Sequence, residues 1–126
     1  CENWHSRGTN LATVDTGSFG YGVGSGGTVT QVTSKGAGVT VHKPSGRIIT
    51  AADSLAAGAT AGFVLTNNKI AATDCLVVNC LSNNNYRVEC AYVGAGSAGI
   101  RITNLTAGAL AEIIYLNFSI IKGASA

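Results

Sequence analysis

The sequence is poor in several features that define large classes of proteins. Its 126 residues include 11% charged residues, a net charge of +2, one tryptophan, one proline and no methionine. So weak and scattered a charge argues against a nucleic-acid-binding protein. No apolar run approaches the roughly 20 residues of a membrane-spanning helix. With 46% hydrophobic residues the chain is not disordered either, so we expect one globular domain with a modest core and with neither nucleic acid nor membrane as a partner.

The missing methionine bears on the first residue, Cys1. We expect an initiator to have been removed by processing or by cleavage upstream, and no signal peptide is visible. Three interpretations stay open: loss of an initiator before a small residue, a mature lipoprotein with a lipidated cysteine, and a proteolytic boundary. The run Cys1-Glu2-Asn3-Trp4 lacks a long polar tether, which argues against the lipoprotein.

Short alternating stretches of apolar and polar residues fill the chain from Thr28 onward, separated by turn-forming residues such as those of "KPSG" (43–46). About seven or eight strands at this spacing predict an all-β fold, an antiparallel jelly-roll-like β-sandwich over 21–126. "AADSLAAGATA" (51–61) is more typical of a loop than of a helix. Arg101 and Thr103 are expected to face outward. The inward-facing residues predict the core: Val39, Val41, Ile48, Phe63, Leu65, Val78, Ile100, Ile102, Leu116, Phe118 and Ile120.

Residues 1–20 show neither helical nor strand periodicity and are expected to form an extended N-terminal arm. Trp4 is the only large anchor in this arm, and we take Trp4, His5 and Arg7 as candidate residues for contact with a neighbouring subunit. The glycine-rich segment that follows is interpreted as a connector. It does not fit a phosphate-binding loop, which needs a strand before it, a helix after it and a suitably placed lysine.

Three of the four cysteines lie within "CLVVNCLSNNNYRVEC" (75–90), which predicts a hairpin over 75–93 around an asparagine-rich turn. Cys75 and Cys80 are five residues apart and so point to opposite faces of a strand, which argues against a shared metal site. A redox pair would prefer the C-x-x-C spacing. Two alternatives remain open. Cys80 and Cys90 form a disulfide, with Cys75 in the core and Cys1 free or bonded to another chain, or all four are thiols and two or three of them fill core space.

Residues suited to catalysis do not form a recognisable pattern. No nucleophile elbow is present, no two carboxylates stand close in the pattern, and Asp53 and Ser54 are adjacent and cannot face each other in an extended chain. We therefore expect a protein that is not an enzyme and binds no cofactor or metal. The sequons at Asn104 and Asn117 lie on or beside predicted strands and are interpreted as chance matches.

Two long stretches, 20–79 and 96–126, resemble a family of small structural proteins of tailed bacteriophages and prophages. The shared pattern includes "TVTQ-TSK--GVT--KPSG-I", "LAAGA---F-LTN--IAATD" and "AGALAE---LNF-IIK". This sequence departs from it at Cys75, Cys80 and Cys90, where Val, Ala or Ser are usual, and in the arm before Gly20. Members of the family are mostly uncharacterised, and the family implies no catalytic residues.

The resemblance implies a capsid decoration (cement) protein that binds the outer surface of the virion and stabilises the head. Its partners would be the major capsid protein and further copies of itself, with a trimer favoured over a dimer. The alternative is a receptor-binding or carbohydrate-binding head of a tail or head fibre, although the few aromatic residues speak against a sugar-stacking surface.

Overall fold

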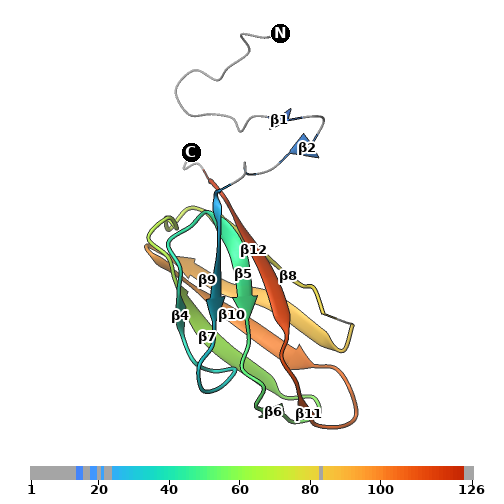
Figure 1. Cartoon of the computed structure of the whole chain (residues 1–126). Coiled ribbons are helices and arrows are strands. Elements are labelled where there is room, and N and C mark those ends of the chain that lie inside the picture. Colours follow the sequence, from blue (N-terminus) through green and yellow to red (C-terminus); the bar gives the residue numbers. More distant parts are fainter. Residues whose placement is uncertain (1–13, 16–17, 20, 22–23, 83, 124–126) are drawn as a thin grey trace, which may run out of the picture.

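The computed structural model describes residues 14–15, 18–19, 21, 24–82 and 84–123 (Figure 1). Within these residues the chain forms twelve strands and no helix, so the all-β expectation is confirmed. Seven of the strands have five or more residues and the other five have two each. The segment 51–61 is mostly loop, as expected, with the short strand β6 (Ser54–Leu55) inside it.

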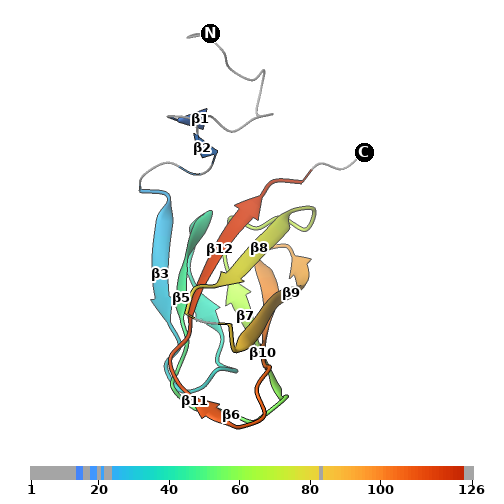
Figure 2. The same cartoon turned by 90° about the vertical axis from the view of Figure 1, so that its right-hand side faces the viewer.

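Two four-stranded sheets form the two layers of the domain (Figures 1 and 2). The first, here called the β5–β12 sheet, has the order β3 (Gly26–Thr30), β5 (Ser45–Ile49), β12 (Tyr115–Ile121) and β8 (Cys75–Cys80). The second, the β7–β10 sheet, has the order β4 (Val39–Thr40), β7 (Thr60–Thr66), β10 (Ser97–Asn104) and β9 (Tyr86–Gly94).

The sheets are mixed, so the expectation of purely antiparallel pairing is wrong at two edges. β3 pairs with β5 in parallel, and β4 pairs with β7 in parallel. The chain passes from β3 to the other layer to form β4 before it returns as β5, and this crossing makes both parallel pairs possible. The jelly-roll connectivity is not confirmed.

Two further pairs of short strands complete the described elements. β6 pairs with β11 (Leu110–Ala111) at the end of the sandwich opposite the start of β3 and the end of β12 (Figure 1). β1 (Val14–Asp15) pairs with β2 (Ser18–Phe19). The expected arm therefore contains a small antiparallel pair where we predicted no strand.

The core lies between the two sheets and largely matches the predicted one. Nine of the eleven predicted residues are buried, and the other two, Val41 and Val78, are half-buried and pack against them. Thr103 was expected outside but is buried, and its Oγ1 atom forms a 2.8 Å hydrogen bond with Oγ1 of Thr60 on the neighbouring strand. The alternation of apolar and polar residues predicts the face of the strand on which Thr103 lies. It does not predict how much of the side chain neighbouring residues cover.

The predicted hairpin over 75–93 is wrong. β8 pairs with β12 and β9 pairs with β10, so the asparagine-rich turn carries the chain from one sheet to the other. Each arm buries its own apolar face against the core, through Leu76 in β8 and Tyr86 in β9. The turn composition indicated a reversal of the chain correctly, but it holds no information on which strand each arm joins.

Candidate functional site

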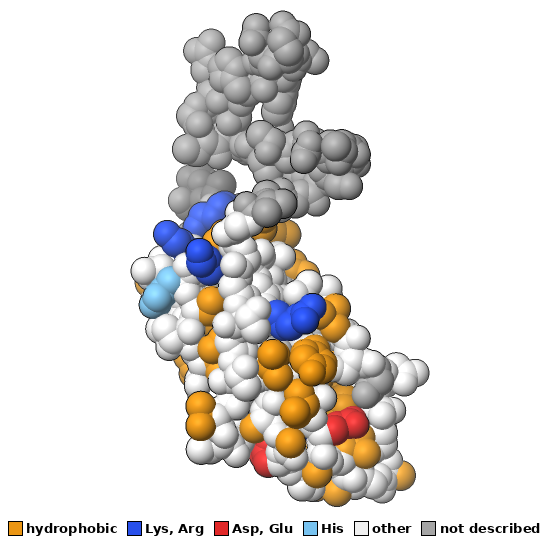
Figure 3. All heavy atoms as spheres, in the orientation of Figure 1, with side chains coloured by type: hydrophobic (Ala, Val, Ile, Leu, Met, Phe, Trp, Pro, Cys, Tyr) orange, Lys and Arg blue, Asp and Glu red, His pale blue; other side chains and the backbone are white. Residues whose placement is uncertain are grey.

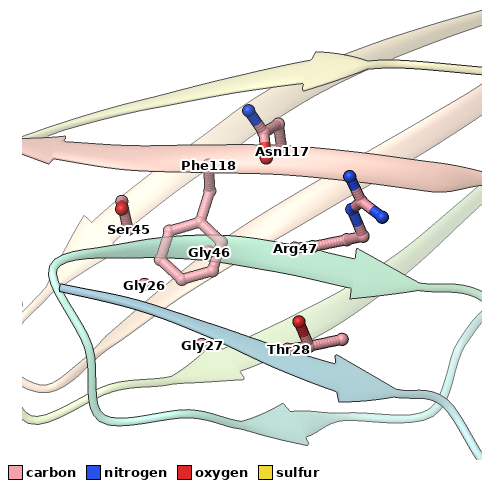
Figure 4. A pocket seen from close by; sticks show the side chains of 8 residues that line it. All are labelled: Gly26, Gly27, Thr28, Ser45, Gly46, Arg47, Asn117 and Phe118. Carbon is pink, nitrogen blue, oxygen red and sulfur yellow. The ribbon is translucent and has the colours of Figure 1, made fainter. Parts of the chain in front are cut away.

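A shallow depression of about 350 Å³ lies on the outer face of the β5–β12 sheet (Figure 4). Its floor is formed by the backbone of Gly26, Gly27 and Gly46, and Arg47 and Asn117 stand at one end. Its outward side chains are a guanidinium, an amide and two hydroxyls, while the ring of Phe118 lies in the core beneath the sheet. These groups can donate hydrogen bonds to a ligand, but they include no base beside a nucleophile.

A second depression, of about 220 Å³, lies on the outer face of the β7–β10 sheet. The ring of Tyr92 lies directly over Gly99, where any Cβ atom would collide with it, and Arg101 borders the same hollow. An aromatic ring thus covers a glycine on the neighbouring strand, an arrangement that fixes the register of paired strands. Tyr92 is still half exposed and offers one face of its ring to solvent.

Exposed apolar side chains follow the outer face of β12 and β8. Tyr115 and Ile121 mark the two ends of β12, Val77 lies on β8, and Leu81 follows it. Leu81 is held beside β12 by a 2.8 Å hydrogen bond from its backbone nitrogen to the carbonyl oxygen of Tyr115. Figure 3 shows the front of the molecule, with hydrophobic side chains gathered in the lower half of the β5–β12 face. The exposed pair Asn79 and Asn117 lies between the two ends, so polar side chains interrupt this strip. Apolar side chains gathered on one face favour a contact with another protein.

Cys75, Cys80 and Cys90 are not brought together as a disulfide within the described part of the chain. Cys75 and Cys80 do point to opposite faces of β8, as predicted, but Cys75 is exposed and not part of the core. Cys80 and Cys90 are half-buried and pack against the core. The Cys90 thiol donates to the carbonyl oxygen of Tyr92 at 3.4 Å, and burial raises the pKa of this thiol.

We expect Cys75 to react with a thiol reagent well before Cys80 and Cys90 in the folded protein. Its sulfur is exposed, whereas burial shields the other two and the raised pKa of Cys90 lowers its thiolate fraction. Brief alkylation at neutral pH followed by peptide mass spectrometry measures the three rates, and a urea-unfolded sample serves as the control. Equal rates in the folded protein would contradict this placement.

Cys1 and the proposed contact residues Trp4, His5 and Arg7 lie outside the described residues. Tyr21, which the sequence analysis did not single out, joins the start of the domain to its end, because its hydroxyl donates to the carbonyl oxygen of Ile120. Burial raises the pKa of Tyr21. Tyr21 therefore lies beside the last residues of β12.

Asp74 holds the end of β12 close to the contact between Tyr21 and Ile120. Its buried carboxylate accepts hydrogen bonds from Nζ of Lys122 at 2.6 Å and from the backbone nitrogens of Ala71 at 2.8 Å and Gly123 at 3.2 Å. Burial raises the pKa of Asp74, but these three donors outweigh it, so the pKa lies below its usual value. The carboxylate is thus held charged as a structural clamp between the segment before β8 and the end of β12.

The Asp74→Asn variant should lose stability at neutral pH and also show a weaker acid dependence than the wild type. A depressed carboxyl pKa contributes stability above the unfolded-state value near 4, and that contribution disappears as the pH falls through the folded-state pKa. Urea unfolding of both proteins between pH 6 and about pH 2 measures the difference. The two curves should converge in acid, and a constant gap would show that the Asp74 charge is not what the clamp needs.

Lys35 is a buried cation, with 1% of its surface exposed. Its Nζ atom donates to the carbonyl oxygens of Ala51 at 2.8 Å, Asp53 at 2.6 Å and Glu112 at 2.9 Å, and lies 3.5 Å from the Asp53 carboxylate. All three ammonium protons are used by these carbonyls, so the group is held for structure and not presented to a substrate. Nothing in the local sequence around Lys35 distinguishes it from a surface lysine.

The described residues contain no group of three or more His, Cys, Asp and Glu side chains placed to hold a metal ion. They also contain no helix that is long and apolar enough to span a membrane. Of the two sequons, Asn104 is fully buried and donates through Nδ2 to the carbonyl oxygens of Leu55 and Gly108, both at 2.9 Å, so it is closed to glycosylation in the folded protein.

No protein-family model, curated protein or solved structure matches this chain. The resemblance to phage structural proteins therefore rests on the residues quoted above.

Proposed function

We propose that this protein is a structural component of a bacteriophage virion, a capsid decoration protein that binds the outside of the head and stabilises it. The observation that carries the proposal is the strip of exposed apolar residues along β12 and β8, which offers a contact surface on a rigid two-layer scaffold. The resemblance of the quoted stretches supports the same role. The partners in this proposal are the major capsid protein and other copies of this chain.

The fold suits a structural role because buried polar groups hold its loops in one conformation. Asn67 donates to the carbonyl oxygen of Lys43 at 2.6 Å, and Lys35 and Asn104 bind other loop carbonyls in the same way. Among the described residues, every buried side-chain nitrogen and oxygen has a hydrogen-bond partner. A surface held in one shape loses little conformational entropy when it docks.

The test is reconstitution on phage heads that lack the protein. Recombinant protein added to heads from a deletion mutant should bind at saturable sites and raise the temperature at which the heads release their DNA. The matched variants are Tyr115→Glu, which places a charge within the apolar strip, and Thr66→Glu, which places one at an exposed position on the other sheet. Equal binding of both variants, or no binding of the wild type, would count against the proposal.

A second candidate is the head domain of a fibre that binds a carbohydrate. The half-exposed ring of Tyr92 beside Arg101 favours it, because sugar rings pack on an aromatic face and their hydroxyls accept from a guanidinium. A glycan array tests it directly. Binding that is lost in Tyr92→Ala and kept in Tyr115→Ala would favour the fibre, and an array without any signal would leave the decoration role as the better account.

A further inference from the structure

Arg47 is the only charged residue in the four strands of the β5–β12 sheet. It is the middle residue of β5, and β5 lies between β3 and β12, so its side chain stands within the outer face and not at its rim. The side chain is exposed, whereas its neighbour Ile48 points into the core. The outer face of this sheet thus carries a single positive charge and no negative one.

The guanidinium of Arg47 has no acidic partner. None of the ion pairs of the described residues includes it, and none of these residues accepts a hydrogen bond from it. Its contact is with Tyr115 on β12, because Cζ of Arg47 lies 5.9 Å from the centroid of that ring. The face of an aromatic ring attracts a guanidinium, so Arg47 is held beside the apolar strip with its N–H groups available to a partner.

The polar neighbours of Arg47 form a row across the sheet. In the strand register Arg47 lies opposite Thr28 on β3 and opposite Asn117 on β12. Asn117 in turn lies opposite Asn79 on β8. Figure 4 shows Thr28, Arg47 and Asn117 on three neighbouring strands beside the shallow depression. Hydroxyl and amide groups both donate and accept hydrogen bonds, but they carry no charge that could neutralise a cation.

We infer that the major capsid protein supplies a carboxylate, from an Asp or Glu side chain, to Arg47 in the proposed contact. This inference rests on the proposed function, in which the strip that includes Tyr115 docks on the head. A partner that covers Tyr115 also covers the guanidinium beside it and removes water from both. A charge that loses its water without gaining an opposite charge is strongly unfavourable, and the planar guanidinium matches a carboxylate through two parallel hydrogen bonds.

Two other occupants fit this face less well. A second copy docked face to face would bring no carboxylate, since the same four strands contain no acidic residue. An acidic saccharide could pair with Arg47 and with the amides of the row, but it would leave the apolar side chains of Val77 and Leu81 in water. A protein surface supplies apolar side chains and a carboxylate together.

Binding to heads from the deletion mutant measures what Arg47 contributes. Arg47→Ala should weaken the affinity about 30-fold or more, as expected when one member of a buried charge pair is removed. The matched control is Arg101→Ala, which removes an exposed arginine from the other sheet and should bind like the wild type.

Zero-length cross-linking identifies the group that meets Arg47. A carbodiimide joins an amine to a carboxylate in contact with it, as an amide and without a spacer. Arg47→Lys places an amine at this position, and on heads it should give a cross-link between position 47 and an Asp or Glu of the major capsid protein, identified by peptide mass spectrometry. Arg101→Lys should give no such cross-link at position 101.

The outcomes separate this inference from the proposed function. If the wild type binds heads but Arg47→Ala binds equally well, the assignment is wrong and the decoration role stands on another contact. The same holds if position 47 cross-links no more than position 101, or only to another copy of this chain. Wild-type binding to alginate, an acidic polysaccharide, that is lost in Arg47→Ala would overturn the protein partner. If the wild type does not bind heads, the inference and the proposed function both fail.

Discussion

Replacing Lys35 with methionine should lower the free energy of unfolding by about 3–5 kcal/mol, the cost of removing one partner from a buried charged network. Methionine fills a similar volume but donates nothing. The carbonyl oxygens of Ala51, Asp53 and Glu112 would then lose the ammonium group that now joins their loops. A buried acceptor left without a donor costs about 1–3 kcal/mol. The bond to Ala51 is buried and the bonds to Asp53 and Glu112 are part-buried, so the three losses together give a value in this range.

Urea unfolding, followed by the far-ultraviolet circular dichroism of the backbone, measures this loss. The matched control is Lys43→Met, which removes the same charge from an exposed position and should change stability by no more than about 0.5 kcal/mol. If the free energy of unfolding of Lys35→Met lies within about 1 kcal/mol of the wild-type value, water replaces the ammonium group at little cost. That result would contradict the structural role given to the buried Lys35.

Replacing Gly46 with alanine should destabilise the protein by about 3 kcal/mol or more, at or above the upper end of the usual cost of overpacking. A Cβ atom at this position would overlap the backbone of Gly27, its register partner in the parallel pair of β3 and β5. Backbone held in a sheet cannot rotate away as a side chain does, so β3 must shift relative to β5.

Two other glycines provide controls for Gly46→Ala. At Gly26 the nearest atom to an added Cβ is Oγ of Ser45 at 3.8 Å, an ordinary contact, so Gly26→Ala should be neutral within about 0.5 kcal/mol. At Gly99 an added Cβ would collide with the ring of Tyr92, which is half exposed and can swing outward at a smaller cost. The urea concentration at the midpoint of unfolding should be highest for Gly26→Ala, lower for Gly99→Ala and lowest for Gly46→Ala. A Gly46→Ala protein as stable as Gly26→Ala would contradict the close approach of β3 and β5.

The strands and their buried faces followed from the sequence because alternation is a local property. A residue such as Phe118 lies inside because its neighbours in the chain lie outside, and no knowledge of the rest of the fold is needed. Pairing is a non-local property. The apolar arms of 75–80 and 86–94 fit a hairpin as well as they fit two separate sheets, and only the competition with β12 and β10 decides between them.

The buried polar groups could not be predicted for the same reason. The acceptors of Lys35 come from Ala51, Asp53 and Glu112, up to 77 residues away in the chain. Tyr21 similarly acts through the carbonyl oxygen of Ile120, 99 residues away. The exposed strip along β12 and β8 could be predicted in part, because the alternation of residues already placed Tyr115 and Ile121 on the outward face. Its meaning as a contact surface depended on knowing that β8 is an edge strand.

The position and copy number of this protein in purified virions test its proposed role most directly. Quantitative mass spectrometry of particles induced from the strain that carries its gene measures the copy number, and electron microscopy with gold-labelled antibody measures the position. A decoration protein should be present in numbers comparable with the major capsid protein and should be labelled over the whole head. A few copies confined to the tail or to fibres, or none in the particle, would contradict it.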